Sequence, residues 1–108
     1  MLNKLRDDIH INARAKGWWM EDRAFGEIIA LCHSELSEAL EEYRNNKPNL
    51  YYNPIDPDKP EGIAIELADC MIRILDYCGR YGIDIEHAIK IKHEYNRKRP
   101  YRHGGKAI

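Results

Sequence analysis

The sequence predicts an all-α fold, arranged as a four-helix bundle. Two observations carry this prediction: apolar residues recur at helical spacing along almost the whole chain, and the alternation of apolar and polar residues expected of a half-buried strand is nearly absent. A length of 108 residues suits one hydrophobic core rather than two. We therefore expect residues 1–108 to form a single helical domain with a loose tail at about 101–108.

Composition excludes several classes of protein. Hydrophobic residues make up 44% of the chain, too many for a disordered protein, and no apolar run is long enough to span a bilayer. The first residues include acids and no apolar core, so we expect no signal peptide. A net charge of -1 argues against a general nucleic-acid binder. The three cysteines lie in apolar stretches without a CxxC pair, which is typical of reduced thiols in a cytoplasmic protein.

The first two helices follow from apolar stripes. The first is expected to end before Gly17, a residue suited to a helix C-terminus, and its stripe consists of Leu2, Leu5, Ile9 and Ala13. The second is expected from about Glu21 to Asn45. Residues 45–57 contain three prolines, several asparagines and two adjacent tyrosines, a composition that predicts a long loop.

The third and fourth helices carry recognisable start and stop signals. Asp58, followed by Pro60 and Glu61, is expected to cap the start of the third helix, which runs to about Arg80. Gly79 and Gly82 mark its end. The fourth helix is expected from Asp84, as N-cap, to about Lys98.

The third helix is apolar around most of its circumference, and a helix of that kind is buried on nearly every side. A chain of this size can barely surround one helix completely. We therefore expect a homo-oligomer, a dimer or a tetramer, that buries the third helix in a subunit interface. The alternative is a compact monomer with this helix at its centre.

Two pairs of acids stand out by their spacing. Glu35 and Glu38 lie three residues apart on the second helix, as do Glu66 and Asp69 on the third. If the helices pack antiparallel, four carboxylates converge and repel one another unless a cation lies between them. Oxygen-only ligands favour Mg²⁺, or Mn²⁺, over zinc. The alternative, strongest for the Glu35 pair alone, is a solvated helix face.

The C-terminal region supplies complementary charge. Between Lys90 and Lys106 there are seven Lys or Arg residues and one acid. Three donors suited to phosphate oxygens share one helix stripe, and Lys106 follows two glycines; the stripe consists of Lys92, Asn96 and Arg99. The alternative is a solvated basic helix end that complements the helix dipole.

Two adjacent tryptophans, Trp18 and Trp19, lie between the first two helices. One of them is most simply an anchor in the core, and the other offers a ring that can stack on a nucleobase. The sequence alone does not assign the two roles.

These residues resemble a known family. The acid motifs ELSEALEE (35–42) and ELAD (66–69), together with KGWW (16–19) and the ending KHEYNRKRPYRHGGK (92–106), resemble the MazG-like nucleotide pyrophosphohydrolases of the all-α NTP pyrophosphatase superfamily. The resemblance covers roughly residues 9–106. The departure from the family is the proline-rich loop between the acid motifs, which is long here.

The resemblance implies a Mg²⁺-dependent enzyme that hydrolyses a nucleoside triphosphate to the monophosphate and pyrophosphate. It implies dimers or tetramers with sites near subunit contacts. Glu35 or Glu38 would position or deprotonate the attacking water. The implied metal ligands are Glu35, Glu38, Glu66 and Asp69, and the expected substrate-binding residues are Trp18, Trp19, Lys92, Asn96, Arg99 and Lys106.

Two alternatives remain open at the level of sequence. A non-catalytic helical module could bind nucleic acid or an acidic partner through the basic C-terminus, but it would leave Glu66 and Asp69 without a role. The same fold could instead act on dUTP or on a phosphoribosyl nucleotide. The preferred base and sugar, and the biological role, are not specified by the sequence.

Overall fold

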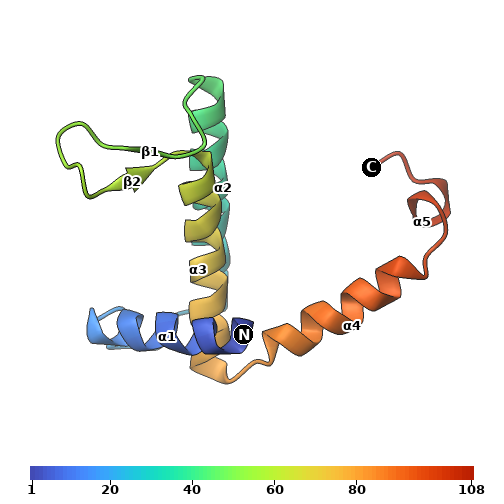
Figure 1. Ribbon diagram of the computed structural model, residues 1–108. Helices are drawn as coiled ribbons and strands as arrows, with labels where there is room; N and C mark the ends of the chain where they lie inside the picture. The colour runs from blue at the N-terminus through green and yellow to red at the C-terminus, as the bar shows by residue number, and fades with distance from the viewer.

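The computed structural model describes residues 1–108 and confirms a mainly helical fold (Figure 1). Five helices and one two-stranded hairpin follow one another along the chain: α1 (Leu2–Ala15), α2 (Phe25–Arg44), β1 (Tyr51–Tyr52), β2 (Pro60–Glu61), α3 (Ile63–Tyr81), α4 (Ile85–Arg97) and α5 (Arg102–Gly105).

The centre of the fold is an antiparallel pair formed by α2 and α3, which lie side by side along their length (Figure 1). Small and medium apolar side chains are buried between them: Ile28, Cys32 and Ala39 from α2, and Cys70, Leu75 and Cys78 from α3. All three cysteines are free and buried. The thiols therefore pack as small apolar groups in the core.

Helix α1 crosses α3 near the end of the α2–α3 pair (Figure 1). The close approach requires Gly79, because a Cβ there would lie 2.6 Å from the Cβ of His10. Beside this contact, the buried ring of His10 shares a 2.8 Å hydrogen bond with Asp76 of α3. The contact fixes α1 and the segment that follows it against the central pair.

Two predicted helix starts are wrong. The second helix begins at Phe25 rather than Glu21, because the backbone is still extended at Ala24, with φ −64° and ψ 138°. The third begins at Ile63, after Gly62, so Asp58 does not cap it. Pro60 belongs instead to strand β2, which pairs antiparallel with β1. Strand β1 lies inside residues 45–57, which were expected to form a loop.

The backbone at Gly62 explains why α3 starts late. Gly62 has a φ of +119°, and a Cβ there would lie 2.3 Å from the carbonyl oxygen of Asn49. That carbonyl accepts a hydrogen bond from the backbone N–H of Ala64, at 3.0 Å, in the first turn of α3. The start of the helix is therefore satisfied by the hairpin segment rather than by an acidic cap.

Helix α4 is capped as expected by Asp84, whose carboxylate accepts the backbone N–H of His87 at 3.1 Å. The side chain of Asn3 donates to the same carboxylate at 2.8 Å, which ties the start of α4 to α1. Beyond this junction α4 projects away from the α2–α3 pair and buries none of its residues (Figure 1). One chain alone therefore does not close a four-helix bundle.

The tail contains one short turn. Residues 101–108 include α5, in which His103 and Gly104 have left-handed backbone angles. Every residue from Pro100 to the end is exposed. The tail thus extends the projecting α4 rather than returning to the core.

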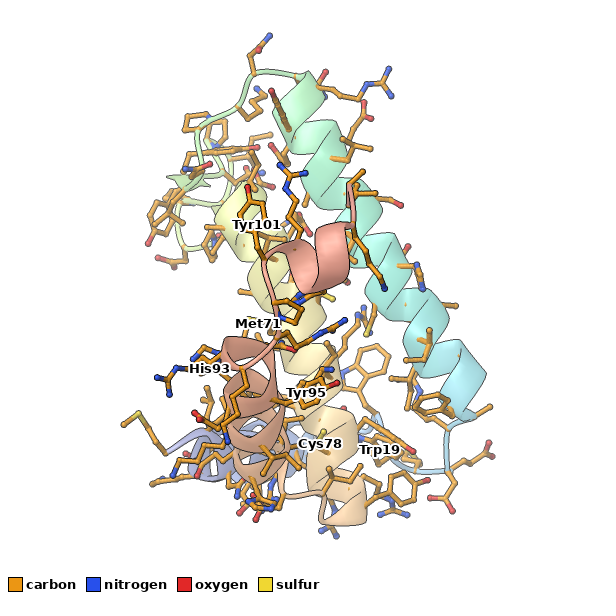
Figure 2. The ribbon with its side chains drawn as sticks, turned by 90° about the vertical axis from the view of Figure 1, so that its right-hand side faces the viewer. Trp19, Met71, Cys78, His93, Tyr95 and Tyr101 are labelled. Carbon is orange, nitrogen blue, oxygen red and sulfur yellow. The ribbon has the colours of Figure 1, made fainter.

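The molecule is open for its size. Its radius of gyration is 16.7 Å, whereas a compact domain of this length has a value of about 13 Å. In Figure 2 Trp19 and Cys78 lie near the end of α3 that α1 crosses. The side chains of Met71 on α3 and Tyr95 on α4 are more than half exposed. None of the helices combines the length and the apolar character needed to cross a membrane.

Candidate functional site

Three carboxylates meet on the α2–α3 pair. Glu35 and Glu38 lie on successive turns of α2, and Glu66 lies in the first turn of α3. One oxygen from each side chain lies within 4.8 Å of the others. The structure therefore brings together three of the four acids that the sequence predicts as metal ligands; these three form the acid cluster.

Asp69, the fourth predicted ligand, is not part of this close group. It lies one turn further along α3 and lines a groove together with Glu35. Burial raises the pKa of Asp69, and the charge of Glu35 adds to that effect, while the guanidinium of Arg73 opposes it. Asp69 thus borders the acid cluster on the side of the groove.

The acid cluster contains buried oxygen atoms without partners. Glu35 is only 7% exposed, and Oε2 of Glu35 and Oε2 of Glu66 have no hydrogen-bond partner. A buried carboxylate oxygen left unpaired costs free energy of folding. Hard oxygen ligands in a group of this kind suit Mg²⁺ or Mn²⁺. The residues present therefore fit the cation that the sequence predicts.

The electrostatics of the cluster agree with its geometry. Burial raises the pKa of Glu66 to about 8, and the neighbouring carboxyl groups of Glu38 and Glu35 add to the effect. Like charges this close disfavour full ionisation, so a proton is retained in the metal-free protein. A cation between the carboxylates would replace that proton.

Arg73 is the member of the site that sequence reasoning missed. In the sequence it lies four residues after Asp69 and three before Asp76, so the three residues form one polar stripe on the otherwise apolar third helix. In the structure its Nε donates to Oε1 of Glu35 at 2.9 Å, and its Nη2 lies 2.9 Å from the same oxygen. Its place in that stripe, one turn beyond Asp69 and facing α2, was the signal that could have found it.

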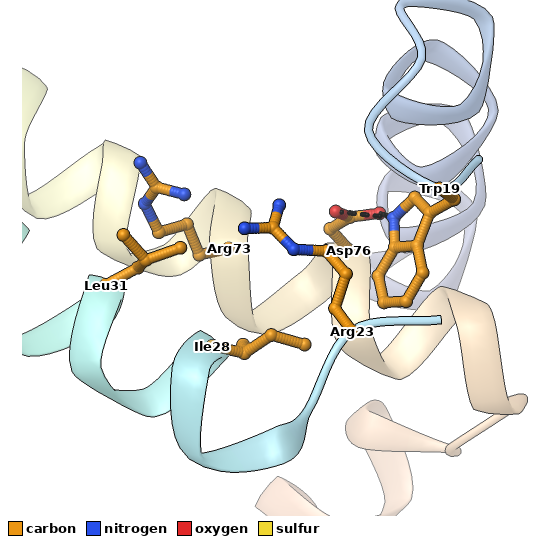
Figure 3. A pocket seen from close by; sticks show the side chains of 6 residues that line it. All are labelled: Trp19, Arg23, Ile28, Leu31, Arg73 and Asp76. Atoms are coloured by element: carbon orange, nitrogen blue, oxygen red, sulfur yellow. Dashed lines mark hydrogen bonds between the residues drawn. The ribbon is translucent and has the colours of Figure 1, made fainter. Parts of the chain in front are cut away.

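The two tryptophans have separate roles. Trp19 is 9% exposed, and its Nε1 donates to both carboxylate oxygens of Asp76 at 2.9 Å, as the dashed lines of Figure 3 show. It is the anchor in the core. Trp18 is 63% exposed and lines the groove, with the guanidinium of Arg23 5.8 Å from the centre of its ring. It is the ring available for stacking.

The groove runs beside the acid cluster and encloses about 600 Å³. Its walls come from α1, from the segment between α1 and α2, and from both central helices. Glu35 and Asp69 line it together with Trp18 and two arginines, Arg23 and Arg73. A volume of this size is within the range that holds small organic ligands.

The predicted basic stripe is not brought to the acid cluster within one chain. Lys92 and Asn96 lie on the projecting helix α4, and Arg99 follows its last turn. The Nζ of Lys92 and the guanidinium of Arg99 approach the ring of Tyr95, at 4.8 Å and 5.7 Å from its centre. The two cations are thus gathered around Tyr95, whereas Lys106 is exposed in the tail.

The hairpin segment adds a second feature that the sequence did not reveal. The hydroxyl of Tyr51 lies 2.9 Å from both carboxylate oxygens of Glu42 and donates to them. Burial, together with this contact, raises the pKa of Tyr51 to about 12. Tyr51 and Glu42 line a hollow of about 240 Å³ that Glu38 and Glu66 share. The hairpin therefore forms one wall beside the acid cluster.

Comparison with protein-family models, curated proteins and solved structures finds no match to this chain.

Proposed function

We propose that the chain is a Mg²⁺-dependent nucleoside triphosphate pyrophosphohydrolase, which converts an NTP or dNTP to the monophosphate and pyrophosphate. The observation that carries this proposal is the convergence of Glu35, Glu38 and Glu66 around two buried, unpartnered carboxylate oxygens. The resemblance of the acid motifs and of the C-terminal stretch to the MazG-like enzymes supports the same activity.

The acids take different roles in this proposal. Glu35, Glu38 and Glu66 hold the cation, with Asp69 at the edge of the site. When bound, Mg²⁺ neutralises phosphate charge and lowers the pKa of a bound water. Glu35 is held by Arg73, whereas Glu38 is exposed. Glu38 is therefore better placed to accept the proton of the water that attacks the α-phosphorus.

The open shape of the chain supports an oligomer. Its accessible surface is 8467 Å², roughly 2,200 Å² more than the 6,200 Å² or so of a compact monomer of its mass. An excess of that size matches the area buried in obligate interfaces. Apolar side chains of α3 and α4 are available for such an interface: Leu67, Met71, Ile74, Ile89, Ile91 and Tyr95. We assign them to contacts with a second copy, which completes the helical bundle.

Assembly would also bring the basic stripe of one copy close to the acid cluster of another. Helix α4 is a projecting arm in one chain, and its donors Lys92, Asn96 and Arg99 lie apart from that chain's α2–α3 pair. A second copy that packs against α4 would receive these donors near its own acids. In this arrangement the triphosphate is held by α4, with Lys106 in the adjoining tail, and the acids belong to the partner.

The buried, free thiols suit a reducing, cytoplasmic setting.

One assay tests the proposal directly. The purified protein is incubated with each of the eight common NTPs and dNTPs and Mg²⁺, and both pyrophosphate and orthophosphate are measured. We expect release of pyrophosphate with at least one nucleotide and its loss in excess chelator. Release of orthophosphate alone, or activity that persists in chelator, contradicts the proposal.

A second candidate function is favoured by one observation, the exposure of the basic residues of α4 and the tail. A non-catalytic module could use them to bind nucleic acid or an acidic partner. Binding of this kind would weaken steeply with salt and would not require the acid cluster. Salt-sensitive binding of DNA or RNA, without any nucleotide hydrolysis, would favour this candidate over the enzyme.

A further inference from the structure

The groove beside the acid cluster has two chemically different ends. Along α3 it extends from Asp69 to Asp76, seven residues or about 10 Å of helix. The first end adjoins the acid cluster through Asp69 and Glu35. At the far end Arg23 and Asp76 line a small pocket together with Trp19 (Figure 3). A substrate whose phosphates lie at the acids has room along the groove for about one nucleoside.

The walls of the groove suit a flat, partly apolar ring. Ile9, Leu31 and Ile72 contribute apolar surface. The ring of Trp18 lies exposed at the same groove. An apolar wall with an exposed aromatic ring favours a nucleobase over a polyphosphate chain, because stacking needs no hydrogen bonds and phosphates gain nothing from apolar surface.

Beyond the acids, the polar side chains of the groove are mostly hydrogen-bond donors, with Arg73 midway along α3 and Arg23 at the far end. Arg23 is anchored through one nitrogen, Nη2, which donates to Glu27 at 2.8 Å, and Arg73 is anchored through Nε and Nη2 on Glu35. Each guanidinium has further N–H groups to offer. The carboxylate of Asp76 already accepts from Trp19 and contacts His10.

The one neutral polar side chain in the groove, Asn12, does not change the excess of hydrogen-bond donors over acceptors. Its amide can either donate or accept, so it does not discriminate between the two kinds of base edge, donor and acceptor. A base edge placed between Arg23 and Arg73 therefore meets donors and needs to present acceptors.

We propose that Arg23 and Arg73 make the site selective for nucleotides whose base carries a carbonyl oxygen at this edge, namely guanine, thymine and uracil. Guanine presents O6 and N7 as acceptors, and thymine and uracil present O4. Adenine and cytosine present an amino group at the same position, so a donor would face the guanidinium groups. This inference rests on the proposed function, because it assumes that the phosphates occupy the acid cluster.

The test compares kcat/KM for dGTP, dTTP and dUTP with the values for dATP and dCTP, all with Mg²⁺. One well-placed donor–acceptor pair changes recognition by about ten- to a hundred-fold. We expect the first three substrates to exceed the other two by at least about tenfold. Equal values, or a preference for dATP or dCTP, overturn the base selectivity and leave the hydrolase intact. Absence of hydrolysis with every nucleotide overturns the proposed function, and this inference with it.

Variants identify the residue responsible. Arg23→Gln should lower the ratio of dGTP to dATP efficiency, and Arg23→Lys should lower it less, since charge is retained but the planar fork is lost. Arg14→Gln, at an exposed arginine of α1, is the matched control and should keep the wild-type ratio. Circular dichroism verifies folding of each variant. A wild-type ratio in the folded Arg23→Gln protein contradicts the assignment.

A binding measurement supplies a readout that is independent of turnover. The chain has two tryptophans, and Trp18 lines the groove, so a base in the groove should quench tryptophan emission. We expect dGMP to quench at concentrations at least about tenfold lower than dAMP. Replacement of Trp18 by Phe should remove most of the quenching, since Trp19 is buried against Asp76. Equal quenching by dGMP and dAMP contradicts the selectivity.

Discussion

Arg73 makes both of its short contacts to Glu35 through a single oxygen, Oε1, with Nε and Nη2 each at 2.9 Å. The other oxygen of Glu35, Oε2, stays buried and without a partner. The guanidinium therefore compensates the charge of a buried carboxylate and fixes its orientation, while one oxygen remains available to a cation. One residue pair thus serves both the stability of the fold and the geometry of the proposed metal site.

Removing Arg73 should destabilise the metal-free protein. In Arg73→Met, Glu35 stays buried and loses its only partner, so the free energy of unfolding should fall by about 1–3 kcal/mol. We expect the lower part of this range, because about a third of the Arg73 side chain is exposed and its charge is partly screened. Urea denaturation with excess chelator measures the change. Unchanged stability, relative to Arg14→Met as control, would show that the ion pair contributes nothing.

Removing one carboxylate of the site should lower activity without unfolding the protein. Glu38→Gln should lower kcat by orders of magnitude, because a residue that holds the cation and accepts the proton is lost. Asp69→Asn should lower kcat less, because Asp69 only borders the acid cluster. The stability of the metal-free protein should hold or rise, since like charges no longer repel. Steady-state kinetics and thermal melts measure the two effects. Glu21→Gln, at an exposed acid outside the site, should retain wild-type turnover.

The sequence predicted the helices of the central pair because their patterns are local. Apolar spacing located α2 and α3, and the i, i+3 pairs placed Glu35, Glu38 and Glu66 on faces that could converge. The hairpin escaped prediction because it depends on contacts from distant backbone, such as the carbonyl of Asn49 against Gly62. The sequence around Asp58 resembles a helix cap, but the contact between Gly62 and the carbonyl of Asn49 places the start of α3 at Ile63 instead.

The role of Arg73 could not be predicted with the same certainty. An arginine between acids on a helix can be exposed to solvent, can form an ion pair with an acid on the same helix, or can form one with an acid on another helix. Only the packing of α2 against α3 places its guanidinium on Glu35. The direction of α4 could not be predicted from the sequence either, because helical periodicity identifies an amphipathic helix but not the surface that covers its apolar face.

The metal-free protein should lose stability as the pH rises from about 4.5 toward 8. Folding raises the pKa of Glu66 from 4.5 to about 8, so the folded chain binds this proton more tightly than the unfolded chain. The stabilising effect of the proton is greatest at low pH, declines as the unfolded carboxyl ionises, and levels off above pH 8. Asp69, whose pKa is also raised, acts in the same direction. Thermal melts across this range measure the loss.

The source of this pH dependence is checked with one variant and with the cation. Glu66→Gln cannot ionise, so its stability should depend less on pH than that of the wild-type protein. Saturating Mg²⁺ should also flatten the profile, because the cation replaces the retained proton, and the affinity for Mg²⁺ should rise over the same interval. A Glu66→Gln profile that parallels the wild type would assign the effect to other groups.

The protein should sediment as a dimer or a tetramer at micromolar concentration. Apolar side chains of α3 and α4 are exposed, as Met71 (55% exposed) and Ile91 (57% exposed) illustrate, and large exposed apolar patches mark interaction surfaces. Met71→Asp or Ile91→Asp should shift the equilibrium toward monomer and lower activity together, if the partner completes the site. Analytical ultracentrifugation measures this shift. A monodisperse wild-type species of 12.7 kDa would refute the assembly.

The basic stripe is tested most directly at Arg99, whose guanidinium lies beside Tyr95 on the projecting arm. A planar guanidinium can bind two phosphate oxygens at once, which lysine reproduces poorly. Arg99→Lys should therefore lower kcat/KM although charge is kept, and Arg99→Ala should lower it further, by about ten- to a hundred-fold, the value of one charged hydrogen bond. Arg97→Ala is the matched control, because Arg97 is engaged with Glu94 at 2.7 Å on the same helix. If the stripe only solvates a helix end, all three variants should keep wild-type kcat/KM on the best nucleotide, and Arg99 would then have no part in the site.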